Sequence, residues 1–169
     1  MSAPRRVLVV GAGGLSSPAL RLLATSGVEQ ITLIDDDSVD ESNLQRQTLY
    51  TDADVGASKI ERAERALRAL SSSLSMRAIE GRFLPGNAEQ LLAENDLVLE
   101  GADNLATKFL VADAARLCGV PAVQAGAVRW AGWALCALPD SACLRCLFED
   151  IPRDRIETCA EAGVVGPVV

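Results

Sequence analysis

Histidine is absent from this 169-residue chain, and aromatic residues make up only 4% of it. Without an imidazole there is no histidine base and no histidine metal ligand, so any chemistry uses other groups. Basic residues are fewer than acidic ones: the chain has 16 Lys and Arg and 23 Asp and Glu, which gives a net charge of −7. Sequence-independent nucleic-acid binding needs massed Lys and Arg, and no apolar run approaches the ~20 residues that span a bilayer. We therefore expect no nucleic-acid partner and no membrane association.

What the chain does contain is typical of a folded protein. Hydrophobic residues make up 49% and charged residues 23%, and this length suits one domain. The apolar run after Arg5 and Arg6 is too short for a signal-peptide core. The five cysteines are an odd number, which without a secretory signal favours reduced thiols. We therefore expect a cytoplasmic protein.

Short apolar runs alternate with longer segments of helical periodicity. The expected strands cover residues 6–10, 30–34, 76–80, 97–100, 122–125 and 133–138, and the expected helices cover 17–26, 59–70, 88–94 and 104–118. Strands that alternate with helices form parallel βαβ units. The sequence therefore predicts an α/β fold with a doubly wound, mostly parallel sheet and helices on both faces. After Pro139 the periodicity fails, so residues 139–169 are expected to be irregular.

A glycine-rich segment follows the first expected strand directly. Gly11, Gly13 and Gly14 fit the Rossmann-like dinucleotide fingerprint, in which glycines allow a tight turn and a close approach of phosphate to the backbone. Ser16 departs from the fingerprint, where Gly or Ala is usual. Asp35 ends the second strand, at the distance where an acid usually binds ribose hydroxyls. The alternative is a glycine-rich turn that binds nothing, and the motif alone leaves the nucleotide open.

The stretch at 35–47, Asp-Asp-Asp-Ser-Val-Asp-Glu-Ser-Asn-Leu-Gln-Arg-Gln, resembles the ThiF/MoeB/HesA family, the bacterial relatives of ubiquitin-activating enzymes. Segments 56–59, 101–104, 143–146 and 159–164 agree in order and spacing. The resemblance implies ATP- and magnesium-dependent adenylation of the C-terminal glycine of a ubiquitin-like sulfur-carrier protein ending in Gly-Gly. It also implies a homodimer, and a place in thiamine or molybdopterin synthesis.

Cations in the matching segments suit the phosphates of ATP, since attack of a carboxylate on ATP brings anions together. Asn43 and Arg46 lie three residues apart, on one face of a helical turn, so both can reach the same phosphates. Ser58 and Glu61 form a capping-box pattern that makes Lys59 the first residue of its helix. A lysine there opposes the helix dipole, which indicates an anionic partner. The alternative for Arg46 and Lys59 is a solvated surface charge.

Asp103 follows the strand expected at 97–100, at the carboxyl edge where open α/β sheets bind ligands. A hard carboxylate there suits magnesium on the phosphates. The alternative is a helix N-cap, because the next helix is expected to begin at Asn104.

The cysteines divide into three groups. Cys143 and Cys146 have the spacing of half a tetrahedral zinc site, and the alternative is a redox pair. Cys159 matches the position that bonds to the carrier or accepts sulfur in some family members, although acidic neighbours raise a thiol pKa. Adenylation itself does not require Cys159. Cys118 and Cys136 lie in apolar elements and are expected to be small core residues.

The sequence departs from the family pattern at Ser16 and at Ala102, where Thr or Ser is common. Relatives also carry a helical segment before the first strand, with an arginine that reaches the partner subunit, and a C-terminal part that completes the sheet and the zinc site. We therefore expect residues 1–169 to be a single ATP-binding adenylation domain that lacks both parts.

Three other functions remain open on the sequence. A nicotinamide-dependent oxidoreductase shares the glycine loop and Asp35 but has no use for Asn43, Arg46 and Lys59 together. Dehydration of a modified tRNA base occurs within the same family, but the acidic charge and missing basic stripe weigh against it. An inactive scaffold subunit is expected to lose its phosphate-binding cations, and this chain keeps them.

Overall fold

The computed structural model describes residues 4–148 and 163–166. Six strands form one sheet in the order β3-β2-β1-β4-β5-β6, and all neighbours are parallel except the antiparallel pair β5 and β6. The strands are β1 (Arg6–Val10), β2 (Gln30–Asp35), β3 (Ser75–Glu80), β4 (Leu97–Glu100), β5 (Ala122–Val128) and β6 (Ala131–Ala137). The sequence-based prediction of a doubly wound, mostly parallel sheet is confirmed.

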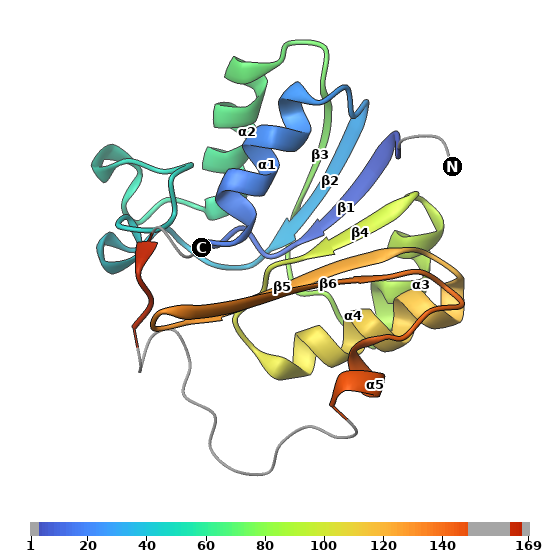
Figure 1. Ribbon diagram of the computed structural model, residues 1–169. Helices are drawn as coiled ribbons and strands as arrows, with labels where there is room; N and C mark the ends of the chain where they lie inside the picture. The colour runs from blue at the N-terminus through green and yellow to red at the C-terminus, as the bar shows by residue number, and fades with distance from the viewer. Residues whose placement is uncertain (1–3, 149–162, 167–169) are drawn as a thin grey trace.

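Helices cover both faces of the sheet (Figure 1). On one face lie α1 (Ser16–Thr25) and α2 (Lys59–Leu70), and on the other lie α3 (Pro85–Ala93) and α4 (Leu105–Cys118). Two apolar cores result, one on each side of the sheet. The central strand β1 contributes alternate residues to both, Val7 and Val9 to one core and Leu8 and Val10 to the other, because successive side chains of a strand point to opposite faces.

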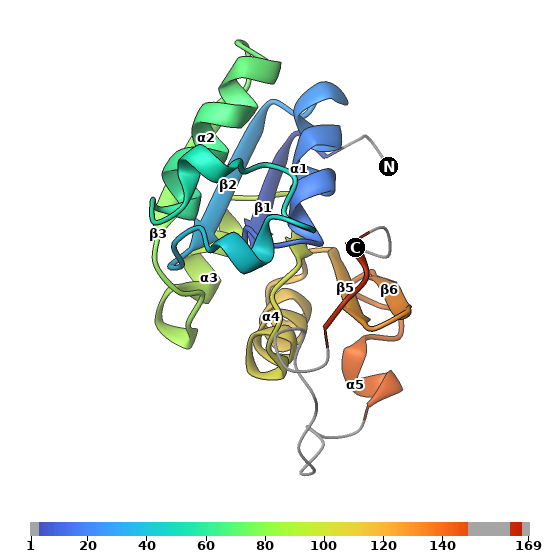
Figure 2. The same cartoon turned by 90° about the vertical axis from the view of Figure 1, so that its left-hand side faces the viewer.

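The strand order places the switch in winding direction between β1 and β4, and ligands of such sheets bind there, beyond the carboxyl ends of the strands. Figure 2 faces this edge, and the segment between β2 and α2 crosses in front of it. That segment contains two short 3-10 helices, η1 (Glu41–Asn43) and η2 (Asp52–Asp54). Val164 pairs with Arg129 in the β5–β6 connection, so residues 163–166 also lie at this edge.

Several elements differ in extent from the expectation. β5 and β6 are longer than predicted and form a hairpin that turns at Arg129, whose φ of 54° is left-handed. α3 begins at Pro85, a residue whose fixed φ suits the first turn of a helix. A short helix, α5 (Leu144–Leu147), lies in the stretch expected to be irregular. Within the described ranges, no helix has the length and apolar character that a membrane span needs.

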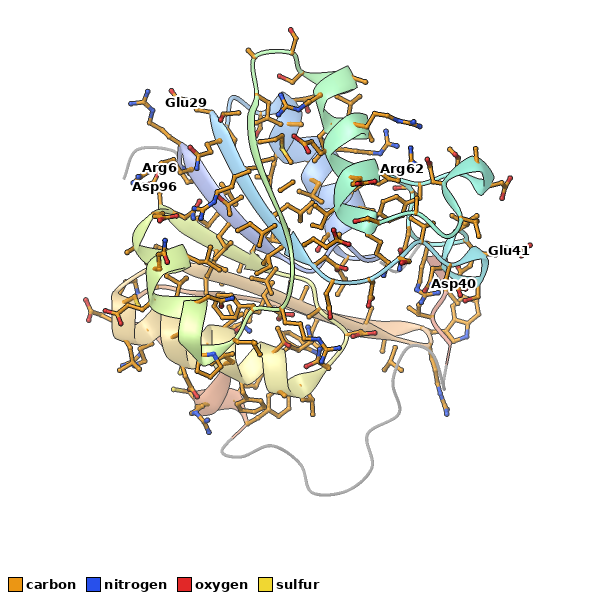
Figure 3. All side chains as sticks on the ribbon, turned by 180° about the vertical axis from the view of Figure 1, so that it is seen from behind. Arg6, Glu29, Asp40, Glu41, Arg62 and Asp96 are labelled. Atoms are coloured by element: carbon orange, nitrogen blue, oxygen red, sulfur yellow. The ribbon has the colours of Figure 1, made fainter. Side chains whose placement is uncertain are left out.

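The opposite edge of the sheet is held by charged contacts. Asp96 accepts hydrogen bonds from the guanidinium and the backbone N–H of Arg6, at 2.7 and 2.9 Å, where β1 begins. Figure 3 shows these two residues together, far from Asp40 and Glu41 at the carboxyl edge. The Arg6 hydrogen bonds lower the pKa of Asp96 to about 2. Asp96 therefore helps to fix the start of β4 beside the start of β1.

Candidate nucleotide-binding site

The glycine loop turns sharply between β1 and α1. Gly11 has a φ of +91° and donates its N–H to the Ile34 carbonyl at 2.9 Å. A Cβ on Gly11 would lie 3.1 Å from the backbone nitrogen of Ala102. Only glycine combines this left-handed conformation with such close packing. The loop is therefore held directly against the β4–α4 turn, which carries Asp103.

Asp35 lies at the end of β2, beside the glycine loop. One carboxylate oxygen accepts the Ala12 N–H at 2.7 Å, and the other accepts the Asp37 N–H at 2.8 Å. Burial raises the pKa of Asp35 above its usual value, against the opposing effect of these hydrogen bonds and of Lys59. Each oxygen of a carboxylate can accept a second hydrogen bond, so the side chain can bind a ribose hydroxyl while it holds the loop.

Lys59 is buried at the start of α2, with 7% of its side chain exposed, and its Nζ lies 2.8 Å from the Asp37 carboxylate. The anionic partner expected from the helix dipole is thus Asp37. The predicted capping box is wrong, because the Ser58 side chain does not cap the helix and its buried Oγ has no hydrogen-bond partner among the described residues. The first N–H of the helix is instead satisfied by the Asp37 carbonyl at 3.0 Å.

Asn43 and Arg46 meet as their spacing predicted. The Arg46 guanidinium donates to the Asn43 side-chain oxygen at 2.6 Å. The next residue, Gln47, is buried, and its amide nitrogen lies 3.8 Å from the place that a Cβ on Gly13 would occupy. The Gln47 side chain thus lies beside the glycine loop, a placement that the sequence did not predict.

Asp103 is exposed at the carboxyl end of β4. The alternative role as an N-cap is wrong, because α4 begins at Leu105 and the Asn104 side chain accepts the Thr107 N–H at 2.9 Å. Among the described residues, Asp103 has no hydrogen-bond or ion-pair partner. Its carboxylate is therefore available to a ligand.

Ser16, the departure from the glycine fingerprint, is accommodated by another glycine. The Ser16 side chain is fully buried, and its Oγ lies 2.4 Å from the place of a Cβ on Gly101. In the usual fingerprint, a glycine at the position of Ser16 allows helix and strand to pack closely. Here Gly101, in the β4–α4 turn, has no side chain and leaves room for the Ser16 hydroxyl.

A buried ion pair, which the sequence analysis missed, lies beneath this turn. Glu100 has no exposed surface, and the Nζ of Lys108 in α4 lies 3.0 and 3.1 Å from its carboxylate oxygens and 2.5 Å from the Ala125 carbonyl. The same carboxylate accepts the Ala102 N–H at 2.6 Å and the Gln124 amide at 3.3 Å. Burial raises the pKa of Glu100, and Lys108 opposes the rise. A lysine among the apolar positions of a helix was the available signal.

The cysteines are spread over the C-terminal half of the structure. The sulfurs of Cys143 and Cys146 lie 3.9 Å apart, and no cluster of three or more potential metal ligands occurs within residues 4–148 and 163–166. Cys159 lies outside the described residues. Cys118 is half-buried, whereas Cys136 is exposed on β6 and is not the core residue expected.

Comparison with known proteins decides the family, because the profile of the ThiF family matches residues 3–169. The chain belongs to the ThiF family. It is 40% identical to the SAMP-activating enzyme E1 of Haloferax volcanii over 162 residues, which cover 95% of this chain and 60% of that protein. It is 44% identical to the probable adenylyltransferase/sulfurtransferase MoeZ of Mycobacterium tuberculosis over 167 residues, covering 95% and 43% of the two proteins.

A solved structure of E. coli MccB with ATP also matches, at 29% identity and a TM-score of 0.73, and covers 84% of this chain and 43% of that one. This ThiF-family chain thus spans about 40 to 60% of the length of these relatives.

Proposed function

We propose that this chain binds ATP with magnesium at the carboxyl edge of the sheet and adenylates the C-terminal glycine of a ubiquitin-like sulfur-carrier protein. The observation that carries the proposal is the convergence of the glycine loop, Asp35, Lys59 and Asp103 at the switch between β1 and β4 in a ThiF-family chain. The names of the relatives from Haloferax volcanii and Mycobacterium tuberculosis support the same activity.

Each group has a role that its surroundings support. Asp35 binds the ribose hydroxyls, because its carboxylate is held beside the loop. Asn43, Arg46 and Lys59 bind phosphate oxygens, and the two cations, Arg46 and Lys59, offset the charge that accumulates during attack. Asp103 holds the magnesium, which neutralises phosphate charge and orients the α-phosphate when bound. An exposed carboxylate with no partner among the described side chains and backbone groups suits a hard cation.

The proposed reaction needs no proton transfer. A carboxylate oxygen of the carrier's terminal glycine forms a bond to the α-phosphorus of ATP, and the bond from that phosphorus to the bridging oxygen breaks. Pyrophosphate leaves with the electron pair, and the glycine remains as an acyl-adenylate. Because the nucleophile is already ionised at neutral pH, the reaction needs no general base. This chemistry is compatible with a chain that contains no histidine.

Zinc and a homodimer belong to the proposal as well. Two thiolates on one tetrahedral zinc, each at ~2.3 Å, lie about 3.8 Å apart, which is close to the observed separation of Cys143 and Cys146. The two remaining ligands must come from elsewhere. Cys159 acts only after adenylation: its thiolate attacks the carbonyl carbon of the acyl-adenylate, a thioester to the carrier forms, and AMP leaves with the electron pair of the broken bond. Cys159→Ala should therefore retain pyrophosphate exchange.

ATP–pyrophosphate exchange with carriers that end in Gly-Gly tests the proposal. Asp103→Ala should lower exchange a hundredfold or more, about 3 kcal/mol of barrier, and leave ATP affinity nearly intact. Lys59→Ala should lower affinity and exchange together, because an ammonium on the phosphates acts in the ground state and the transition state. Asp140→Ala, an exposed acid after β6, serves as a control and should change neither.

Three results would contradict parts of the proposal. Normal exchange in Asp103→Ala would remove the magnesium assignment. Calorimetric binding of NAD in place of ATP would favour the oxidoreductase alternative. ATP binding without exchange, for every Gly-Gly carrier, would support the inactive scaffold.

A further inference from the structure

Tyr50 is a buried tyrosine whose hydroxyl lies beneath the glycine loop. It is 5% exposed and belongs to the core cluster between the sheet and α1 and α2. Its hydroxyl donates to the Ala12 carbonyl at 2.8 Å. A buried tyrosine hydroxyl usually has a hydrogen-bond partner. Here the partner is a carbonyl of the glycine loop, so the hydrogen bond fixes the orientation of a loop peptide.

Two successive peptide groups of the loop are fixed from outside it. The peptide between Gly11 and Ala12 is held by Asp35, which accepts the Ala12 N–H at 2.7 Å. The peptide between Ala12 and Gly13 is held by Tyr50 through its carbonyl. In a trans peptide the carbonyl and the N–H point in opposite directions, and the chain has no cis peptide among its described residues. The Gly13 N–H therefore points away from Tyr50 and the core.

Beyond Ala12, the N–H groups of the loop have no acceptor in the part of the chain that the structure describes. Among the described residues, no backbone or side-chain group accepts from the N–H groups of Gly13, Gly14 or Leu15. These residues lie at the start of α1, where backbone N–H groups and the helix dipole favour an anion. The Tyr50 hydroxyl also polarises the peptide that carries the Gly13 N–H, which makes that group a better donor.

We infer that Tyr50 is a positioning residue for nucleotide phosphate: its hydroxyl holds the Ala12–Gly13 peptide so that the Gly13 N–H donates to a phosphate oxygen. The inference rests on the proposed ATP-binding function and adds a residue that touches no substrate. Asp35 and Tyr50 have different roles in nucleotide binding: Asp35 contacts the ribose directly, whereas Tyr50 acts only by orienting a peptide of the loop.

The test is Tyr50→Phe, which removes the hydroxyl and keeps the buried ring. Dissociation constants of ATP and of adenosine are measured by calorimetry, with adenosine in competition with ATP. ATP affinity should fall about three- to tenfold, the value of one net hydrogen bond, and adenosine affinity should stay within twofold because adenosine has no phosphate. The amide NMR signal of Gly13 should shift on addition of ATP to the wild-type chain.

Thr32→Val is the matched control. Thr32 is a fully buried residue of β2 whose hydroxyl has no hydrogen-bond partner in residues 4–148 and 163–166, so removal of this hydroxyl should leave both affinities unchanged. Equal losses of ATP and adenosine affinity in Tyr50→Phe would show a general structural role and overturn the inference. Unchanged ATP affinity would also overturn it. A wild-type chain that binds no ATP would refute the proposed function together with the inference.

Discussion

The buried ion pair between Glu100 and Lys108 should dominate the response of this fold to mutation. Lys108→Met keeps the length of the side chain but removes its charge, so Glu100 is left with no exposed surface and no cation within contact. Removal of one partner from a buried pair costs about 3–5 kcal/mol. Such a domain has a total stability of about 5–15 kcal/mol, and the loss should lower the melting temperature by roughly 6–20 °C.

Urea unfolding at several pH values measures the effect and its cause. In Lys108→Met the folded-state pKa of Glu100 should rise further above its unfolded value, since burial then acts without the opposing ammonium. A raised folded pKa contributes stability that is present below the unfolded pKa and lost as pH rises through the folded one. The variant should therefore regain stability as the pH is lowered from 8 toward 5.

Two further variants separate charge from packing. The double variant Glu100→Gln with Lys108→Met should recover at least half of the loss, because no buried charge remains. Asp113→Asn breaks an exposed pair on the same helix and should cost less than about 1 kcal/mol. If Lys108→Met lost no more than Asp113→Asn, or if its stability did not depend on pH, the reasoning would be refuted.

Three smaller predictions concern the rest of the structure. Gly101→Ala should lower the free energy of unfolding by about 1–3 kcal/mol, because the new Cβ would lie 2.4 Å from the Ser16 hydroxyl and overpack the turn. In a Ser16→Gly background the same substitution should cost much less, because that contact is gone. Equal costs in both backgrounds, measured by urea unfolding, would contradict this explanation. The lowered pKa of Asp96, about 2, gives stability that is present above its unfolded value near 4 and lost as pH falls toward 2, so Asp96→Asn should flatten the acid unfolding curve. Asp37→Asn should tighten ATP binding up to about fivefold, since it frees Lys59 from an exposed partner, and weaker binding by calorimetry would show that the pair is needed intact.

Most of the fold was predictable from the sequence, because it depends on local pattern. The buried strand Val7–Val10 and the glycines after it required only hydrophobic runs and the conformational freedom of glycine. Motif and spacing predicted Asp35, Arg46 and Lys59 as nucleotide-binding residues, and the structure places Asp35 at the loop and joins Arg46 to Asn43. Alternation of elements then determined the parallel sheet.

Only the tertiary structure decided which polar groups satisfy one another. Ser58 and Asp103 both had plausible local roles as caps, but the chain packs the Asp37 carbonyl and the Asn104 side chain at those helix ends. The side-chain partners of Glu100 lie 8 and 24 residues away, and Tyr50 reaches Ala12 across 38 residues. Hydropathy periodicity reports which side of an element faces the core, whereas a buried hydrogen bond depends on the positions of two distant segments to within a few tenths of an ångström. Those positions follow from how the helices pack on the sheet.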